Sequence, residues 1–232
     1  MAAWVGTKTR IIGGIKLQAR EKALIIIGLL EKAYPQAGTK LQYSSNFELL
    51  VAIVLSAQTN DDQVNKVTRD LFYQYKQPHE FAALSEAKLQ EKIKSVGLYK
   101  NKARHIIQMA RMICHKYQGV VPSTLEELLE LPGVGRKSAN VMLSVGFNQP
   151  GLGVDTHVQR VSNRIGIVSG QYPDQTEIAL KKLVPESMWT LLHHLLIHHG
   201  RAVCKAKNPQ CAQCVIASYC EKKLTNAAGQ QS

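Results

Sequence analysis

One segment, NFELLVAIVLSAQ at residues 46–58, is apolar on nearly every side of a helical projection. A helix of this kind is stable only when other elements cover its whole circumference, so we expect it at the centre of a packed domain. Helical signals recur on both sides of it, whereas strand signals are almost absent. The sequence therefore predicts an all-α fold.

Start and stop signals divide the rest of the chain into further helices. We expect capping boxes at Ser123 with Glu126 and at Asp174 with Glu177, and a helix end at Gly119. The expected helices are residues 19–34, 46–58, 61–75, 85–94, 100–118, 122–131, 136–147, 156–165, one opening at 174, and 186–199.

The charge balance points to a nucleic-acid partner. Lys and Arg number 29 against 17 Asp and Glu, which gives a formal net charge of +12. Neutralising phosphates releases counterions and favours association, although a generally basic protein without such a partner remains an alternative. The longest apolar run, ALIIIGLL at residues 23–30, is far shorter than the ~20 residues that cross a membrane, so we expect no membrane association.

The N-terminal segment is basic, with Lys8, Arg10, Lys16 and Arg20 and no acidic residue among the first 20. A transit peptide would be richer in Ser and more amphipathic. We therefore interpret residues 1–19 as a basic arm that is disordered in part. We expect a cytoplasmic, nucleoid-associated protein of a prokaryote, while the arm leaves organellar or nuclear targeting open.

The stretch LPGVGRKSAN at residues 131–140 joins two expected helices through a tight turn. Pro132 stops the first helix, and Gly133 and Gly135 permit positive φ and close approach of another backbone. Unpaired N–H groups at the start of the next helix form a good anion site. In a basic protein the natural anion is a DNA phosphate, and the alternative is a helix–helix joint without a ligand.

Lys137 follows this turn, where a lysine is unfavourable beside the positive end of a helix dipole. That field and partial burial are expected to lower its pKa, so that the neutral amine can form a Schiff base with an aldehydic carbon. A solvated lysine that contacts phosphate is the alternative. Asp155 in GVDTHVQR could stabilise a cationic sugar C1′ or move protons, or it could be a simple N-cap.

Four of the five cysteines lie together in a C-x6-C-x2-C-x5-C pattern near the C-terminus. Four thiolates at this density predict a zinc or iron–sulfur site, and the wide first loop favours the bulkier iron–sulfur cluster. Lys205 and Lys207 project from that loop as a second candidate contact to DNA phosphate. Cys114 is interpreted as a small buried hydrophobe. The four candidate ligands are Cys204, Cys211, Cys214 and Cys220.

The hairpin, the VDTH motif 18 residues after Lys137 and the cysteine pattern occur together. This combination resembles the endonuclease III family of DNA glycosylase/AP lyases, within the helix-hairpin-helix superfamily. The resemblance extends from about residue 20 to residue 221. It implies that Lys137 is the Schiff-base nucleophile, that Asp155 is the catalytic carboxylate and that the four cysteines hold one 4Fe-4S cluster.

The resemblance also implies which residues bind DNA. Gln58 would fill the gap left by a flipped base, and Leu98 would wedge between bases. Read without the family, these two are a polar helix end and a core or hairpin leucine. His157 would be a structural or phosphate-proximal residue. The implied DNA-binding residues are Gln58, Leu98, Gly133, Val134, Gly135, Arg136, His157, Lys205 and Lys207.

The fold implied by the resemblance has two helical lobes with a DNA-binding cleft between them. Residues 39–149 would form a six-helix barrel that carries the hairpin. Residues 20–38 and 150–221 would form a discontinuous iron–sulfur domain, and residues 222–232 a tail. The histidines of HHLLIHHG at residues 193–200 are expected to serve packing and hydrogen bonding.

The implied function is base-excision repair by a bifunctional glycosylase and AP lyase acting on oxidised pyrimidines. Its partner would be double-stranded DNA with a damaged base or an abasic site, and the enzyme would work as a monomer. A monofunctional glycosylase of the adenine or mismatch type shares the hairpin and the aspartate but lacks the lysine. A non-catalytic DNA-binding module is the other alternative.

Overall fold

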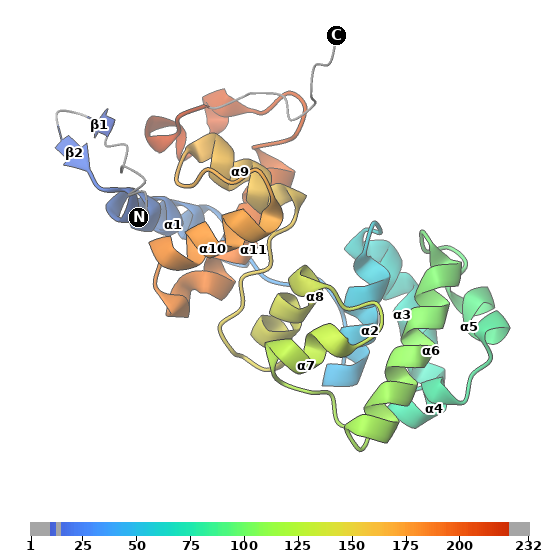
Figure 1. The fold of residues 1–232 in the computed structure, drawn as a ribbon. Coiled ribbons are helices and arrows are strands. Elements are labelled where there is room, and N and C mark those ends of the chain that lie inside the picture. The colour runs from blue at the N-terminus through green and yellow to red at the C-terminus, as the bar shows by residue number, and fades with distance from the viewer. Residues whose placement is uncertain (1–9, 13–14, 223–232) are drawn as a thin grey trace, which may run out of the picture. The chain divides into compact units, whose positions relative to one another are not determined.

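The computed structural model describes residues 10–12 and 15–222, and within them nearly all regular structure is helical (Figure 1). The expected all-α class is confirmed. The expectations for residues 1–9 and for residues 223–232 of the tail lie outside the described residues. The α-helices are α1 (Ala19–Ala33), α2 (Asn46–Ser56), α3 (Asp61–Gln74), α4 (Pro78–Ala82), α5 (Glu86–Ile93), α6 (Tyr99–Lys116), α7 (Leu125–Glu130), α8 (Arg136–Val141), α9 (Thr156–Ile165), α10 (Pro173–Leu183) and α11 (Trp189–Ala202).

Shorter turns of helix complete the fold. A π-helical turn, η1 (Met142–Gly146), continues α8, and three 3₁₀ turns follow later in the chain. By contacts between Cα atoms the chain divides into two compact units. One unit comprises residues 39–153, and the other joins residues 1–38 to residues 154–232. The 3₁₀ turns are η2 (Glu186–Met188), η3 (Cys211–Gln213) and η4 (Ala217–Tyr219).

Two short strands in the basic arm were not expected. Strand β1 (Arg10–Ile12) pairs antiparallel with β2 (Ile15–Leu17), with Arg10 opposite Leu17. β-Branched residues on both sides of a Gly-Gly pair are a hairpin signal in the sequence. The expectation of a basic arm that is disordered in part did not include this hairpin of six residues.

Helix α2 is the centre of the unit formed by residues 39–153. Its residues 49–52 and Leu55 are fully inaccessible to solvent, and it contacts α3, α6, α8 and η1. Ser45 caps the helix by accepting from the Glu48 N–H at 3.2 Å. The expected central helix is therefore confirmed, because a helix that is apolar all round needs neighbours on every side.

Helix α4 was missed by the sequence analysis. It packs against α6 and buries Phe81 completely, with the ring in edge contact with Phe47 and Tyr75 at centroid distances of 5.2 and 6.0 Å. A local signal was present, because Gln77 and Glu80 form a capping box around Pro78 at the first helical position. Five residues are too few for the helical period to show.

Three local expectations are wrong. The cap of α7 is Thr124, which accepts from the Glu127 N–H at 3.3 Å, one residue after the expected Ser123 with Glu126. Asp174 lies inside the first turn of α10, because Pro173 starts that helix one residue earlier. Cys114 is half-buried rather than buried, since its place on the amphipathic α6 lies beside the apolar face and not within it.

The second unit packs α9 and α1 against α11. The α11 histidines are part of this packing, as expected: His193 and His199 are 2% and 1% exposed. The His193 ring is in edge contact with that of His194 at 4.9 Å between centroids. Burial, and to a smaller extent the charge of His198, lower the pKa of His194 to about 4.

The His194 site predicts acid sensitivity of this unit. In the unfolded chain His194 binds its proton near the ordinary value of 6.5, whereas in the folded chain it does so only near 4. The unfolded state therefore binds more protons as the pH falls through this window, and the free energy of unfolding decreases. As the pH falls from about 7.5 to about 5, the thermal midpoint of wild type should therefore decrease more than that of His194→Gln. A constant difference across this range would contradict the assignment.

Candidate active site and cysteine centre

The turn between α7 and α8 combines an exposed backbone with a buried anchor. Val134 is 6% exposed and donates its N–H to Leu131 O at 3.0 Å. Gly133 and Gly135 on either side of it are exposed. Gly135 is the N-cap residue of α8 and has no side chain to occupy the first N–H groups of that helix. The turn therefore presents backbone donors to solvent.

The two glycines serve different purposes. Gly133 has φ +83°, and a Cβ there would lie 2.9 Å from Cβ of His105 on α6. Gly135 has φ −92°, so the expectation of positive φ holds for Gly133 alone. A Cβ on Gly135 would meet no atom within 4 Å. Gly133 is thus required by packing, and Gly135 leaves open space through which a ligand backbone can approach.

Lys137 lies in the first turn of α8 and is exposed. The expectation of partial burial is therefore wrong for the chain without DNA. The reason is the helical period, which directs Ala139, Asn140 and Leu143 into the core and leaves positions 136 and 137 outside. Residues Arg136, Lys137 and Gly135 form one continuous exposed stretch.

Asn140 is a residue of this site that the sequence analysis missed. It is 1% exposed, and its side chain donates to Arg136 O at 3.0 Å and accepts from the Leu152 N–H at 3.2 Å. A Cβ on Gly151 would lie 2.2 Å from Asn140 O. Asn140 therefore fastens residues 151–152 to the helix that carries Lys137. Its partner lies 12 residues away in sequence, so no local pattern reveals it.

Asp155 is the N-cap of α9 and is half-buried. Its Oδ1 accepts from the N–H groups of His157 at 2.8 Å and Val158 at 2.9 Å. The capping interpretation is therefore confirmed. Capping also fixes the direction of the carboxylate, and Oδ2 takes no part in these two bonds. Lys137 belongs to the unit of residues 39–153 and Asp155 to the other unit.

His157 contacts a second residue that the sequence analysis did not single out. Arg160 Nη2 lies 3.1 Å from His157 Nδ1 and donates to the carbonyls of Gly200 at 3.0 Å and Cys204 at 3.1 Å. Burial is the largest cause that lowers the pKa of His157, and Arg160 adds to it. The helix capped by Asp155 is in this way tied to the end of α11 and to the first cysteine.

The four cysteines of the C-terminal pattern line one cavity. It is closed by mostly apolar side chains, among them Ile165, Val203 and Ile216. Several polar groups approach the sulfur atoms. His199 Nε2 lies 3.5 Å from Cys214 Sγ, the Lys222 N–H donates to Cys220 Sγ at 3.3 Å, and Arg164 Nη1 donates to Cys204 Sγ at 3.8 Å.

This donor set fits an iron–sulfur cluster. Burial raises the pKa of the Cys214 thiol, and the charges of Cys220, Cys204 and Cys211 raise it further. Four thiolates in one apolar cavity repel one another unless metal cations neutralise them. Donors aimed at the sulfurs and a largely apolar lining are the surroundings that such clusters use.

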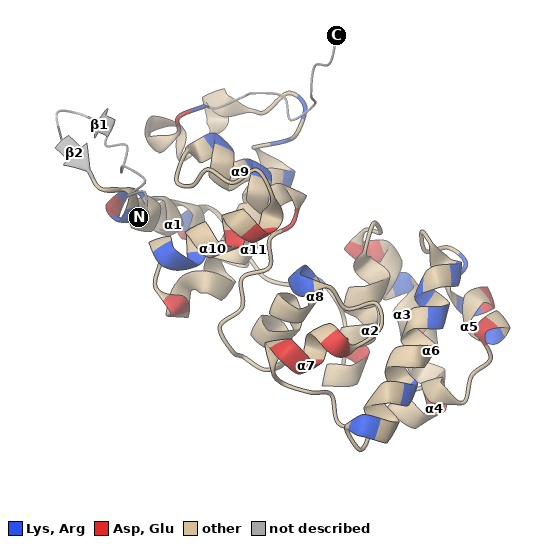
Figure 2. Ribbon diagram, viewed as in Figure 1, with Lys and Arg blue, Asp and Glu red and all other residues tan. Residues whose placement is uncertain are grey.

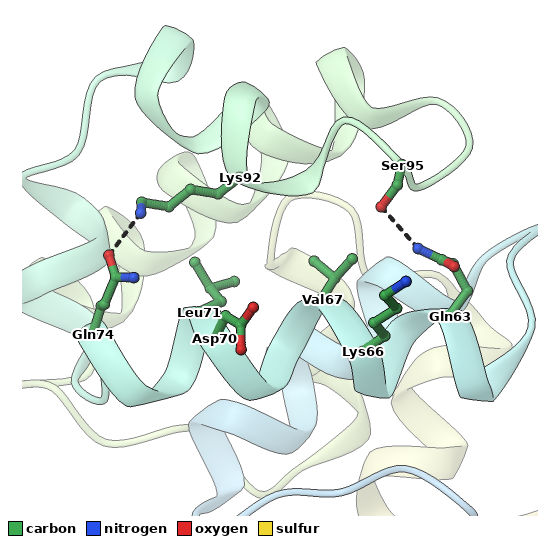
Figure 3. Close-up of a pocket in the computed structure, with 8 residues that line it drawn as sticks. All are labelled: Gln63, Lys66, Val67, Asp70, Leu71, Gln74, Lys92 and Ser95. Atoms are coloured by element: carbon green, nitrogen blue, oxygen red, sulfur yellow. Dashed lines mark hydrogen bonds between the residues drawn. The ribbon is translucent and has the colours of Figure 1, made fainter.

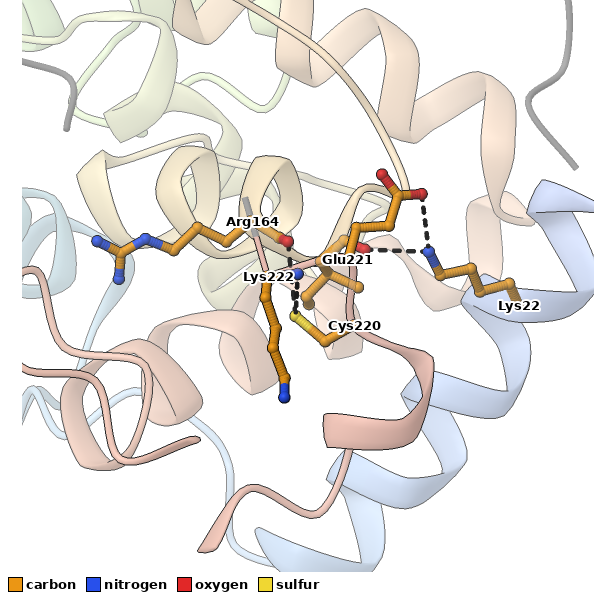
Figure 4. A network of polar contacts seen from close by, with 6 residues as sticks. Lys22, Arg164, Cys220, Glu221 and Lys222 are labelled. Atoms are coloured by element: carbon orange, nitrogen blue, oxygen red, sulfur yellow. Dashed lines mark hydrogen bonds and ion pairs between the residues drawn. The ribbon is translucent and has the colours of Figure 1, made fainter. Parts of the chain in front are cut away.

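A polar network fastens the last cysteine to the rest of its unit (Figure 4). Lys22 of α1 is 7% exposed and donates to Ile165 O at 3.0 Å and to Glu221 Oε1 at 3.3 Å. The Glu221 N–H donates to Ile165 O at 3.1 Å. The two Lys22 bonds join segments 143 and 199 residues apart, and together with the Glu221 bond they hold the end of the cysteine segment against α1 and α9.

The first cysteine loop is held from inside while its lysines face water. Arg164 donates to the carbonyls of Lys205 at 2.6 Å and Ala206 at 2.9 Å. The side chains of Lys205 and Lys207 are exposed. Asn208 has φ +50°, which fits the turn expected there. The loop is therefore a rigid support for two basic side chains.

Gln58 and Leu98 are exposed residues in the left-handed backbone region. Their φ values are +56° and +57°, and Leu98 is 58% exposed. A Cβ on Gly97 would lie 3.5 Å from Gln58 O, so the two loops are neighbours. An exposed leucine in a strained turn is unusual for a core role. The core alternative for Leu98 is therefore wrong, whereas the alternative of a hairpin leucine stays open.

One groove on this unit lies away from these residues. It runs between α3 and α5 and is crossed by two bonds, Gln63 to Ser95 at 2.8 Å and Lys92 to Gln74 at 2.6 Å (Figure 3). None of the candidate catalytic residues lines it.

Figure 2 shows basic residues along α6 and at the start of α8. No helix in the described part of the chain is long and apolar enough to span a membrane.

Comparison with known families gives two matches. Residues 51–186 match the HhH-GPD superfamily of base excision DNA repair proteins. Residues 204–220 match the iron-sulfur binding domain of endonuclease III, so the expected iron–sulfur cofactor is confirmed. The two matches contain the hairpin and the cysteine pattern respectively.

Curated relatives and solved structures agree. Endonuclease III of Bacillus subtilis is 47% identical over 82% of this chain and 87% of its own length, and that of Escherichia coli is 41% identical over 88% and 97%. A trapped endonuclease III–DNA covalent intermediate superposes with a TM-score of 0.84 at 43% identity, covering 88% of this chain and 96% of that one. The chain therefore belongs to the endonuclease III family of the HhH-GPD superfamily of base excision DNA repair proteins.

Proposed function

We propose that this protein is a bifunctional DNA glycosylase and AP lyase that excises oxidised pyrimidines and nicks the strand at the resulting abasic site. The observation that carries the proposal is Lys137, exposed in the first turn of α8 directly after a hairpin with open space around Gly135. Related proteins support it, since an endonuclease III has been trapped as a covalent intermediate with DNA. The substrate is then double-stranded DNA with a damaged base or an abasic site.

The hairpin supplies the grip on DNA. The exposed N–H groups before α8 and the side chain of Arg136 bind a backbone phosphate of the damaged strand. Such contacts carry no sequence information, which suits an enzyme that must act wherever damage occurs. The same contact brings C1′ of the flipped nucleotide to Lys137, and enclosure by DNA removes water from the amine.

Lys137 supplies the nucleophile. Its neutral amine attacks C1′, the C1′–N bond to the base breaks, and the base leaves with the bonding electrons and a proton. The aminal then opens to an imine between C1′ and Nζ. Loss of a C2′ proton and departure of the 3′ phosphate cleave the strand by β-elimination. Water finally hydrolyses the imine and releases the enzyme.

Asp155 supplies the negative charge. Its carboxylate, held by two N–H groups of α9, stabilises the cationic sugar that forms as the base departs. It also accepts and returns protons during sugar opening. Capping and catalysis are compatible because the cap uses one oxygen of the carboxylate.

The four cysteines hold one 4Fe-4S cluster, whose role is to cross-link the C-terminal segment. With Cys204, Cys211, Cys214 and Cys220 as ligands, the loop with Lys205 and Lys207 becomes a fixed second contact to DNA phosphate. We further propose residues 39–149 as the barrel domain and residues 20–38 with 150–221 as the iron–sulfur domain. The protein would act as a monomer on chromosomal DNA in the bacterial cytoplasm.

The first prediction from the proposed function concerns the covalent step. Wild-type protein should cleave an abasic duplex and form a borohydride-trapped adduct, and Lys137→Gln should do neither, because the nucleophile is gone. Asp155→Asn should keep DNA binding but slow base release by about a hundredfold or more. A quenched-flow assay of base release and a denaturing gel of strand cleavage measure both. Strand cleavage by Lys137→Gln at the wild-type rate would refute the proposal.

A second prediction separates the two hairpin glycines. Gly135→Ala meets open space in the free protein, so its thermal midpoint should stay near that of wild type. The added methyl group should nevertheless block the phosphate and weaken binding to abasic duplex by about tenfold, or 1.4 kcal/mol. Gly133→Ala should lose stability as well, because of its φ and its contact with His105. Unchanged binding by Gly135→Ala would show that no phosphate sits at this turn.

A third prediction concerns the cysteine loop. Replacing both Lys205 and Lys207 by Ala should reduce the slope of log affinity against log salt by ~0.9 for each phosphate that the loop no longer neutralises. Iron content and visible absorption should match those of wild type, because neither side chain contacts the cavity. An unchanged salt slope would show that these lysines do not contact DNA.

A further inference from the structure

A lysine that the chemistry above does not use is almost wholly buried. Lys102 of α6 is 5% exposed. Burial lowers its pKa from the ordinary value. Lysine is rarely buried to this degree unless its ammonium has partners, since removal of a charge from water is unfavourable. A buried lysine in such a position therefore requires a reason.

The ammonium of Lys102 has three neutral oxygen partners at one place. Its Nζ donates to Leu55 O at 2.8 Å, to Ala57 O at 2.5 Å and to Thr59 Oγ1 at 3.3 Å. Leu55 and Ala57 lie at the carboxyl end of α2, where the helix dipole favours a cation. The three donors of the ammonium match these three acceptors. Lys102 is thus a cap for α2 supplied by another helix.

The segment that Lys102 holds contains Gln58. Gln58 lies between the two held residues Ala57 and Thr59 and has φ +56°. A left-handed conformation is unfavourable for a residue with a side chain and persists only where neighbours impose it. The bonds from Lys102 to both flanking residues impose it here, and they leave the Gln58 side chain exposed.

The same residue also holds Leu98. The Lys102 backbone N–H donates to Leu98 O at 3.1 Å as the first turn of α6 forms. Leu98, at the N-cap, has φ +57°. The loop that contains Leu98 lies against the loop that contains Gln58. A Cβ placed on Gly97 would lie 3.5 Å from Gln58 O. Lys102 therefore bonds through its main chain to one loop and through its side chain to the other.

We propose that Lys102 is a positioning residue that fixes the spacing of Gln58 and Leu98, the two side chains that enter the DNA stack when the damaged base leaves it. The inference rests on the proposed function, because it assumes that these loops enter DNA. Lys102 itself touches neither DNA nor the reacting atoms. Its loss impairs base extrusion and leaves the lysine chemistry intact.

The test compares substrates that do and do not need extrusion. Lys102→Met keeps the length of the side chain and removes its donors. Its kcat/KM for base release from a damaged duplex should fall about tenfold or more, whereas its cleavage of a single-stranded abasic oligonucleotide should equal that of wild type. Equal losses on both substrates would overturn the proposal, because they would indicate a general defect.

A second arm does not depend on catalysis. In a Lys137→Gln background, 2-aminopurine placed beside the lesion should brighten on binding when Lys102 is present and should not when it is Met. If 2-aminopurine brightens in this assay but wild-type protein does not cleave the strand, the lyase function is refuted and the role of Lys102 is retained. Full brightening with Met at position 102 would overturn that role.

Double substitutions test whether Lys102 acts through the loops. In a protein that already carries Gln58→Ala and Leu98→Ala, the further substitution Lys102→Met should reduce duplex activity by less than twofold. The spacing of the two side chains no longer matters once both are removed. A full tenfold further loss would show that Lys102 acts elsewhere.

Two more variants guard against loss of fold. Ile113→Ala, about three turns further along α6 and fully buried, is the matched control for lost stability and should lower both activities alike or neither. Thr59→Val removes one acceptor while Lys102 remains. It should shift the duplex-to-single-strand ratio in the same direction as Lys102→Met, by a smaller factor. If Lys102→Met does not fold, the decision rests on Thr59→Val. A ratio of duplex activity to single-strand activity equal to that of wild type in Thr59→Val would then overturn the proposal.

Discussion

The complete burial of α2 is the constraint on which the unit of residues 39–153 depends. A helix with no polar face has to be enclosed, and α3, α6, α8 and η1 enclose it. Each of the functional segments of this unit is attached to that enclosure. The Gln58 loop leaves the end of α2, Leu98 is the N-cap of α6, and Lys137 lies in the first turn of α8. The positions of these three exposed residues, to which we assign roles in DNA binding and catalysis, thus follow from the packing of a core that their side chains do not enter.

Helix α9 has the corresponding role in the other unit. Its first residues orient the Asp155 carboxylate, and Arg160 and Arg164 further along donate to carbonyls at the first cysteine and its loop. Charged donors are costly to bury unless their bonds are made, so the two arginines specify one arrangement of helix and loop. The carboxylate proposed for the chemistry and the loop proposed for DNA binding are thereby both attached to a single helix.

What could be predicted from the sequence depended on the range of the interactions. Most helices were expected correctly because apolar period and caps act within a few residues, and the family matches confirm the iron–sulfur cofactor. Caps were misplaced by one residue where adjacent Ser123 and Thr124 can both serve. Burial of Lys137 was wrongly expected, because its exposure depends on which face of α8 meets α2. Asn140, Arg160 and Lys102 were overlooked, since their partners lie 12, 44 and 47 residues away.

The central claim is that Nζ of Lys137, and no other amine of this lysine-rich chain, bonds to C1′ of the damaged nucleotide. Proteolysis of the borohydride-reduced adduct and mass spectrometry of the nucleotide-bearing peptide locate that bond. The account predicts one modified peptide, with the sugar remnant on Lys137 in the sequence LPGVGRKSAN. A remnant on the N-terminal amine or on another lysine, with Lys137 unmodified, would contradict it.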